Sequence, residues 1–281
     1  MEKIGFNKYI NIFGLAIVSL AVVFTYRETF LWMYERFMGA DSYYSHGFLV
    51  PLVALFFVYQ QKDRLVETEQ QTNLAGFFVV VFALFLHILG TVLYIFSISG
   101  MSLFFLATGL ALFLFGTKIC KLIWFPLLFL IFMFPLPMAV ISFVSFPLKI
   151  FAAKVGVWFV GTLGIPIHAE GFNIFIPAGH LLVGNPCSGL RSLIAFLALG
   201  AVFAHLTPIS IGRKWILFFI TIPIAILSNV VRIPILILVS QYWGLEAAMP
   251  DTLVHTGSGM LVFIIGILLL LATAKALEWR T

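Results

Sequence analysis

Apolar residues in this chain occur in long runs that are separated by short polar stretches. A helix needs about 20 residues to cross roughly 30 Å of hydrocarbon, and six of the runs are close to that length. Two shorter runs are also counted, because omitting one of them alone would reverse the orientation of everything that follows. We therefore predict an all-α membrane protein with about eight transmembrane helices. The predicted spans lie near residues 9–26, 47–60, 74–96, 101–116, 122–140, 188–206, 216–241 and 257–274.

Composition and basic residues support this interpretation. Of the 281 residues, 62% are hydrophobic and only 10% are charged, unlike a soluble domain. Lys and Arg collect in short cytoplasmic loops. With the N-terminus inside, ten of the 16 basic residues lie in cytoplasmic segments, four in external ones, and two, Arg191 and Arg232, in helices. Both chain ends are therefore predicted to be cytoplasmic. Loops beside anionic headgroups account for the net charge of +5, so no nucleic-acid partner is predicted.

The longest predicted external segment, residues 141–187, contains two patterns. FPLKIFAAKVGVWFVGTLG is typical of an amphipathic or re-entrant helix, and IPIHAEGFNIFIPAGHLLVG alternates around glycines like a small hairpin. Irregular backbone of this kind must contact water or protein rather than lipid. We predict that this segment caps the outer mouth of the bundle. We also predict that residues 1–281 form a single integral membrane domain with no soluble C-terminal domain.

The sequence contains no metal-ligand spacing, no phosphate-binding loop and no dinucleotide-binding motif. Its two cysteines, Cys120 and Cys187, are predicted on opposite faces of the membrane, so they do not form a disulfide within one chain. The six histidines are scattered. No cofactor and no metal is predicted.

Four residues that are costly inside a membrane fall at one depth, near the external face: Cys187, Arg191, Arg232 and His255. Cys187 begins the sixth predicted span, with Arg191 one turn further along the same face. The helix dipole and a nearby guanidinium both favour a thiolate, the form that attacks a carbonyl carbon. Arg232 lies about 24 Å along the seventh span, and His255 opens the eighth. The thiol, a base and a cation are therefore predicted to meet.

These residues also have structural interpretations. An isolated Cys is commonly a small packing residue, and a His at a helix end is commonly an interface residue or a cap. Arg191 can extend to lipid headgroups. Arg232, with Asn229 one turn before it on the same face, can form a structural polar pair inside the bundle. His87, in the third predicted span, lacks a charged companion nearby and is interpreted as a packing residue.

Three segments closely resemble the exosortase and archaeosortase family of multi-spanning cysteine transpeptidases. They are NPCSGLRS at 185–192, IPIAILSNVVRIPI about forty residues later, and HTGSGMLVF, which begins at His255. Further similarity lies in SHGFLVPL at 45–52, in FPLPM and in GIPIHAEGFNIFIPAGHLLV. The resemblance covers about residues 40–270 and is strongest over 164–264.

The resemblance implies a sortase-like activity at the outer face of a bacterial, or archaeal, cytoplasmic membrane. Its substrates would be secreted proteins with a C-terminal signal composed of a short recognition motif, a hydrophobic helix and a basic cytoplasmic end. It implies that Cys187 is the nucleophile, His255 the base or acid, and Arg232 the third member, which stabilises the oxyanion or orients the scissile carbonyl. Membrane lipids are the other expected partners. Candidate supporting or substrate-binding residues are Arg191, Ser188, Asn229 and His46.

Two other functions remain open at this point. A transporter or lipid-linked saccharide flippase would also contain eight spans and intramembrane arginines. Transport predicts internal repeats and polar groups near the midplane, whereas this chain has no clear repeat and its polar groups cluster at one edge. A serine membrane protease is suggested by Ser258 in HTGSG. That function needs a second His at the same depth, and His87 is the only intramembrane candidate.

Overall fold

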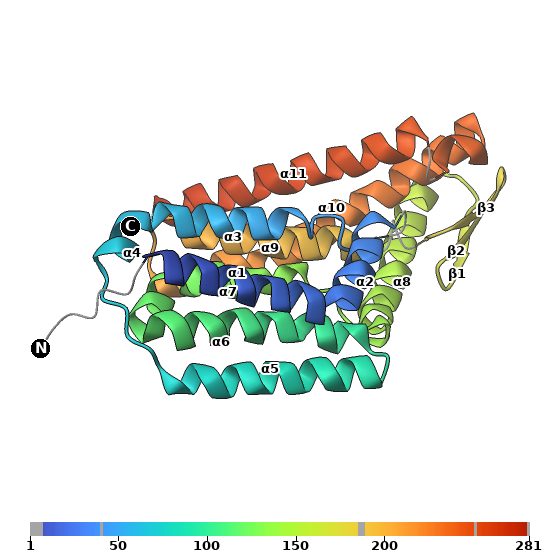
Figure 1. Ribbon diagram of the computed structural model, residues 1–281. Helices are drawn as coiled ribbons and strands as arrows, with labels where there is room; N and C mark the ends of the chain where they lie inside the picture. Colours follow the sequence, from blue (N-terminus) through green and yellow to red (C-terminus); the bar gives the residue numbers. More distant parts are fainter. Residues whose placement is uncertain (1–7, 40–41, 185–188, 250–251, 280–281) are drawn as a thin grey trace, which may run out of the picture. The chain divides into compact units, whose positions relative to one another are not determined.

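The computed structural model describes residues 8–39, 42–184, 189–249 and 252–279, and the chain is mostly helical (Figure 1). It divides into two compact units. Unit 1 comprises Met1–Met38 and Val53–Pro135, and unit 2 comprises Gly39–Leu52 and Leu136–Thr281. Helix α3 (Leu49–Gln60) passes from unit 2 into unit 1. Each unit is described by itself below.

Unit 1 is a set of helices in which α5 and α6 form the most extensive contact. The two helices lie side by side (Figure 1), and two glycines explain how closely their backbones approach. A Cβ atom added at Gly76 would lie 2.2 Å from the Phe113 backbone nitrogen, and one at Gly109 would lie 2.8 Å from the Val80 nitrogen. Small residues at such positions are typical of helices packed within membranes. The elements are α1 (Lys8–Thr25), α2 (Arg27–Met38), α4 (Lys62–Glu67), α5 (Leu74–Val92), α6 (Phe96–Leu122), α7 (Trp124–Phe129) and the 3-10 helix η1 (Leu130–Met133).

A buried polar cluster lies where α1 bends by 69° into α2. The Tyr26 hydroxyl is 2.9 Å from Ser102 Oγ, and Thr29 Oγ1 is 2.6 Å from Ser99 Oγ. The same Ser99 oxygen is 2.7 Å from His87 Nδ1, and the His87 ring packs on the Tyr26 ring. The expected packing role of His87 is therefore incomplete, because the ring is also hydrogen-bonded. We call these five residues the unit 1 polar cluster.

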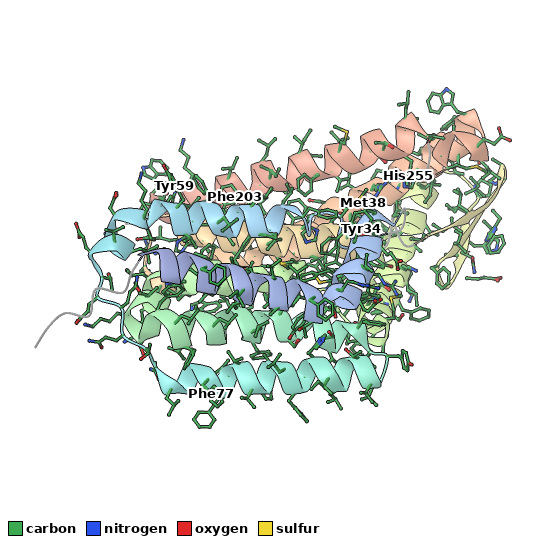
Figure 2. The ribbon with its side chains drawn as sticks, in the orientation of Figure 1. Tyr34, Met38, Tyr59, Phe77, Phe203 and His255 are labelled. Carbon is green, nitrogen blue, oxygen red and sulfur yellow. The ribbon has the colours of Figure 1, made fainter. Side chains whose placement is uncertain are left out.

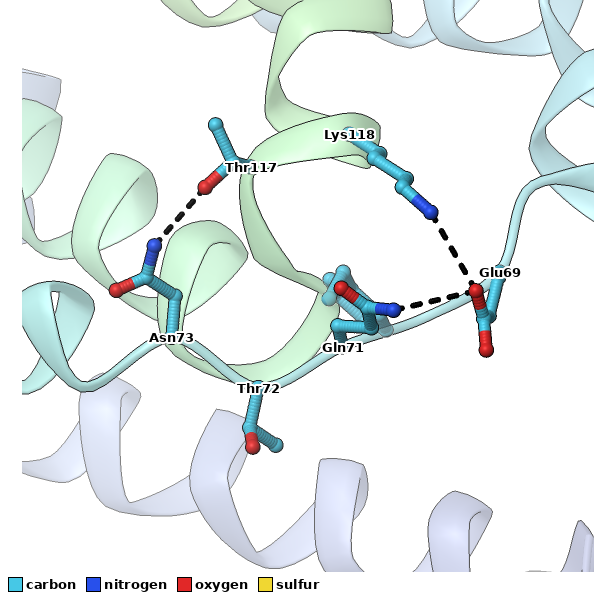
Figure 3. Close-up of a pocket in the computed structure, with 7 residues that line it drawn as sticks. Glu69, Gln71, Thr72, Asn73, Thr117 and Lys118 are labelled. Atoms are coloured by element: carbon cyan, nitrogen blue, oxygen red, sulfur yellow. Dashed lines mark hydrogen bonds and ion pairs between the residues drawn. The ribbon is translucent and has the colours of Figure 1, made fainter. Parts of the chain in front are cut away.

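Helix α6 is kinked near its end, and a loop holds the kink in place. Gly116 has φ of 82°, and a side chain there would collide with the Gln71 carbonyl. The loop before α5 is tied to α6 by a hydrogen bond from Asn73 Nδ2 to Thr117 Oγ1 and by an ion pair of Lys118 with Glu69 (Figure 3). These groups line a small polar pocket. The ion pair is largely exposed, so it contributes little to stability, and we interpret the pocket as part of this structural clamp.

Unit 2 is organised around the long helix α10, which contacts α8, α9, α11 and the 3-10 helix η3. At 33 residues, α10 is about 50 Å long, which exceeds the thickness of the hydrocarbon layer. Figure 1 shows α8 running across the direction of α9 and α11. The elements are α8 (Met138–Thr162), β1 (His168–Glu170), β2 (Asn173–Ile176), β3 (Gly179–Leu182), α9 (Leu190–Leu206), α10 (Ile211–Trp243), η3 (Leu245–Ala248) and α11 (Leu253–Glu278).

The predicted hairpin is present and contains one strand more than expected. The strands form an antiparallel sheet in the order β1-β2-β3. Ile174 and Ile176 on its inner face are buried with Ile233 and Ile237 of α10 and with Ala153 of α8. The sheet is therefore anchored beside the segment of α10 that follows Arg232.

Five helices in the described part of the chain are long and apolar enough to cross a membrane, or six if the bent α1–α2 pair is one span. The five are α5, α6, α8, α10 and the helix that ends at Glu278. Helices α3, α9 and α7 with η1 are shorter than a full span. The chain is thus an all-α multi-pass membrane protein, whereas the count of eight spans and the orientation stay predictions.

The expected span at 122–140 is wrong as a single helix. The helical segment ends at Met133, and a new helix begins at Met138. Pro135 and Pro137 lie between them, and proline lacks the backbone N–H that a helix interior requires. The segment after it, expected to be amphipathic or re-entrant, is the 25-residue helix α8, which by length and composition also qualifies as a span.

Candidate active site

Arg232 is a buried cation that joins two helices of unit 2. It lies on α10, about 32 Å from the start of that helix, and its side chain is 8% exposed. Its Nη2 donates to the His255 carbonyl at 3.0 Å, and its Nε donates to Ser258 Oγ at 3.3 Å. Ser258 Oγ itself donates to the same carbonyl at 2.8 Å. The guanidinium is therefore held on the first turns of α11.

The start of α11 positions His255 through its own capping residue. Thr252 is the N-cap, and its Oγ1 accepts a hydrogen bond from the His255 N–H at 3.2 Å. The Thr252 hydroxyl also bonds the Ala247 carbonyl at 2.9 Å, which ties α11 to η3. His255 lies at this end of α11 (Figure 2), and the residue is only 6% exposed. A conventional helix cap thus fixes where the imidazole is placed.

The hydrogen bond of the His255 ring determines its neutral tautomer. Nδ1 lies 3.2 Å from the Ala248 carbonyl oxygen. A carbonyl only accepts hydrogen bonds, so Nδ1 must carry the proton. In the neutral ring the lone pair is then on Nε2, which is the arrangement that a histidine needs in order to act as a general base.

The start of α9 packs against α10 one turn before Arg232. Gly189 has φ of 77°, and a Cβ atom there would lie 2.7 Å from Asn229 Nδ2. Asn229 is 3% exposed and precedes Arg232 by about 4.5 Å along the helix axis. Cys187 and Ser188, the other predicted residues of this segment, lie outside the described residues. Gly189 is the first described residue that follows them.

The electrostatics of this region favour an anion. Helices α9 and α11 both begin here, and both N-termini approach the turn of α10 that contains Asn229 and Arg232. A helix N-terminus has the effect of about half a positive charge. An anionic group close to these two helix ends and to the guanidinium would be stabilised by all three.

Three residues contribute more to this arrangement than the sequence indicated. The sequence suggests Ser258 only as a possible nucleophile, whereas in the structure it holds Arg232. A Cβ atom at Gly259 would lie 3.3 Å from Arg232 Nη2, so this glycine leaves room for the guanidinium. The positive φ of Gly189 allows the close approach to Asn229. The one-turn spacing of His255 and Ser258 is the only signal that could have identified Ser258 as a holding residue.

The remaining predicted residues lie in two places. Arg191 is the second residue of α9 and is half-buried. His46 lies in the segment before α3, stacked on the Tyr44 ring at 6.0 Å.

The Tyr44 hydroxyl accepts a hydrogen bond from the Leu136 N–H at 3.1 Å, and burial raises the pKa of Tyr44 to about 12. Tyr44 therefore stays protonated at any physiological pH, and it fastens this segment to the start of the Leu136–Thr281 region.

Neither a metal cluster nor a serine–histidine pair is formed by these residues. The described part of the chain contains no group of three His, Cys, Asp or Glu side chains that could hold a metal ion. Ser258 Oγ bonds Arg232 and the His255 carbonyl, while His87 Nδ1 bonds Ser99. The described contacts therefore give no support to a Ser258–His87 protease.

Comparison with known proteins identifies a family. The family model described as transmembrane exosortase (Exosortase_EpsH) matches residues 32–272, which is most of the chain. No curated protein and no solved structure matches.

Proposed function

Because this chain belongs to the transmembrane exosortase family, we propose that it is a cysteine transpeptidase or protease that removes the C-terminal sorting signal of secreted proteins. The signal would consist of a recognition motif, a membrane helix and a basic end. Cleavage would occur at the outer face of a bacterial or archaeal cytoplasmic membrane, with both ends of the chain inside. Cys187 would be the nucleophile, His255 the base and acid, and Arg232 the residue that binds the reacting carbonyl.

The observation that carries this proposal is that one stretch of α10 contacts the starts of both α9 and α11. Arg232 is hydrogen-bonded to the backbone of His255, and the adjacent turn of α10 contacts Gly189. Residue 187 is two peptide units from Gly189, a reach of about 7 Å. A thiol in this position would be within range of the base and the cation. Arg191 and Ser188, on either side of Gly189 in the sequence, are proposed to support the thiolate.

The proposed reaction begins with transfer of the thiol proton of Cys187 to His255 Nε2. The thiolate attacks the scissile carbonyl carbon, a C–S bond forms, and the carbonyl electron pair moves to oxygen. The tetrahedral intermediate collapses, the C–N bond breaks, and His255 gives its proton to the departing amine. The substrate is then a thioester on Cys187, and its membrane helix is released.

In the second half of the reaction His255 again acts first as base and then as acid. A water molecule, an amine or a lipid headgroup attacks the thioester carbon, and His255 accepts the proton of the attacking group. The C–S bond breaks, and the thiolate regains a proton from His255. Arg232 is proposed to stabilise the oxyanion in both halves, because a fixed donor in a dry site contributes on the order of a hundredfold in rate. An alternative role for Arg232 is to orient the scissile carbonyl before attack.

The decisive experiment follows processing in cells of a candidate substrate from the same genome, a secreted protein with a C-terminal signal helix and a basic end. Wild-type enzyme, Cys187→Ser and Cys187→Ala would be compared at equal membrane levels. Cys120→Ser is the matched control, because it removes the other cysteine of the chain, which is half-buried near the end of α6. We expect loss of processing only for the two Cys187 variants.

Full processing by Cys187→Ser and Cys187→Ala would refute the cysteine mechanism and favour transport or a structural role. If the thiol is required, mass spectrometry of the product C-terminus distinguishes the reactions. A free carboxylate indicates hydrolysis, and an added amine or headgroup indicates transfer.

A further inference from the structure

The outer edge of strand β3 has open backbone groups. Residues on an antiparallel pair alternate between those that exchange hydrogen bonds and those that do not. The Val183 N–H donates to the Phe172 carbonyl at 3.0 Å, so Leu181, two residues earlier, also faces β2. The N–H and C=O groups of His180 and Leu182 therefore point away from the sheet. Among the described residues no hydrogen bond is made to these groups, and both side chains are exposed.

This edge lacks the features that usually protect an edge strand. Natural proteins block open edges with charged residues, proline or bulges. Strand β3 is short, with the four residues GHLL, but it contains no proline and no Lys, Arg, Asp or Glu, and Leu182 is 60% exposed. The opposite edge is different. Strand β1 has three residues, ends in Glu170, and directs only the backbone of Ala169 outward.

The open edge lies beside the candidate active site. The inner face of the sheet packs on Ile233, the residue that follows Arg232 on α10, and η3 covers this same inner face through Leu245. Neither Ile233 nor Leu245 is hydrogen-bonded to the outward backbone groups of His180 and Leu182. In the sequence, Leu182 precedes Cys187 by five residues, which is a reach of at most about 18 Å. A strand on this edge would lead toward the proposed nucleophile.

We propose that the β3 edge binds an extended segment of the substrate protein, next to its scissile bond, as a fourth strand of the sheet. Strand addition to an open edge uses backbone hydrogen bonds for affinity, while alternate side chains provide selectivity. His180 and Leu182 supply the backbone groups, and the exposed Leu182 side chain supplies an apolar contact. This inference depends on the proposed function, because it takes its occupant from the substrate of that reaction.

The test measures binding without catalysis. The probe is a synthetic peptide that covers the ten or so residues before the signal helix of the substrate processed in the cell experiment. Its affinity is measured for the full-length Cys187→Ala protein in detergent, alone and combined with Leu182→Pro. Proline at 182 removes one outward N–H and leaves the β2–β3 hydrogen bonds in place. We expect an affinity loss of about three- to tenfold, the range for one backbone hydrogen bond.

Two controls separate this effect from damage to the sheet. Ala169→Pro makes the same kind of change at the outward position of β1, and it should leave the affinity unchanged. Leu182→Ala keeps the backbone donor and should lose less affinity than Leu182→Pro. In addition, N-methylation of single peptide amides should weaken binding at every second position, since alternate amides of an added strand face the edge.

Equal affinities for Leu182→Pro and Ala169→Pro, or N-methyl effects without a two-residue period, would overturn the inference. Self-association that is lost in Leu182→Pro, with peptide binding unchanged, would assign the edge to a second copy of the chain instead. These outcomes are independent of the cysteine mechanism, because they concern binding to a protein that lacks the thiol. Processing that does not require Cys187 would refute the proposed function by itself.

Discussion

The two units each contain a buried polar cluster, and the clusters differ in kind. In unit 1, Tyr26, Thr29, His87, Ser99 and Ser102 bond mainly to one another, and every member is a hydroxyl or an imidazole. In unit 2, the permanently charged guanidinium of Arg232 lies at the start of α11. It donates there to a backbone carbonyl and to a hydroxyl. Burial of polar groups therefore does not by itself identify a site. A fixed cation beside a histidine of defined tautomer is the feature that distinguishes unit 2.

The comparison predicts that removing the cation abolishes processing and leaves the fold intact. Arg232→Ala should reduce the rate of substrate processing at least about a hundredfold, the effect of losing a fixed oxyanion donor. Arg232→Lys retains the charge but cannot reproduce the two directed hydrogen bonds of the guanidinium. We expect this control to recover little activity. Processing in isolated membranes would be measured, and thermal unfolding in detergent would verify folding. Undiminished processing by Arg232→Ala would remove Arg232 from the proposed mechanism.

The start of α9 provides a test of intermediate size. Gly189→Ala should lower the processing rate about tenfold or more, because the new Cβ atom would displace Asn229, and displacement of an active-site segment is costly. Gly164→Ala is the matched control. Gly164 also has positive φ, at 80°, but nothing lies within 4 Å of an added Cβ atom. Both variants should lose about 1 kcal/mol of stability from backbone strain. An equal loss of processing in both would show that strain, and not the contact with Asn229, is responsible.

Loss of the Ser258 hydroxyl should have a smaller effect. Ser258→Ala removes one of the hydrogen bonds that hold the Arg232 guanidinium, while the bond to the His255 carbonyl remains. We expect about a threefold decrease in processing, less than the full value of a charge-assisted hydrogen bond, because the guanidinium keeps its bond to the His255 carbonyl. Ser240→Ala is a suitable comparison, because Ser240 Oγ on α10 is buried and has no hydrogen-bond partner among the described residues. Loss of all processing in Ser258→Ala would instead revive the serine protease hypothesis.

The smallest effect on processing is expected in unit 1. Ser99→Ala breaks the bonds to Thr29 and His87 at once, and it should destabilise the protein by about 1 kcal/mol. Processing per folded molecule should not change. Thermal unfolding and processing would be measured on the same preparations. A processing defect that exceeds the loss of folded protein would mean that the unit 1 polar cluster takes part in function, and the contrast between the units would fail.

The unit 1 polar cluster shows what a single sequence conceals. Tyr26, Thr29, Ser99 and Ser102 are ordinary residues spread over 77 positions, from Tyr26 to Ser102, and no local pattern connects them. The absence of a charged companion near His87 predicts a packing role, whereas its hydrogen-bond partner Ser99 lies on the next helix. In contrast, Arg232 could be singled out directly, since a charge within an apolar run has a high free-energy cost whatever its partners are.

Secondary structure was predictable where one signal dominated. The apolar run at 74–96 predicts α5, and the alternation around glycines predicts strands at 168–182. The prediction of one span at 122–140 is wrong, because hydrophobicity continues through Pro135 and Pro137 although the helix does not. The short helix α3 and the crosswise course of α8 show the same limit. Hydropathy measures affinity for lipid, and it does not determine how a helix is oriented.

The sequence alone determined the class of this protein and the residues worth testing. Length, hydropathy and three local motifs were sufficient for a multi-pass membrane protein of the transmembrane exosortase family. These properties are local or additive along the chain. Only the tertiary structure decided that Nδ1 of His255 faces a carbonyl, that Ser258 holds Arg232, and that β3 leaves an open edge. Each of these depends on the direction of a hydrogen bond between distant segments, which is a geometric property that no residue type specifies.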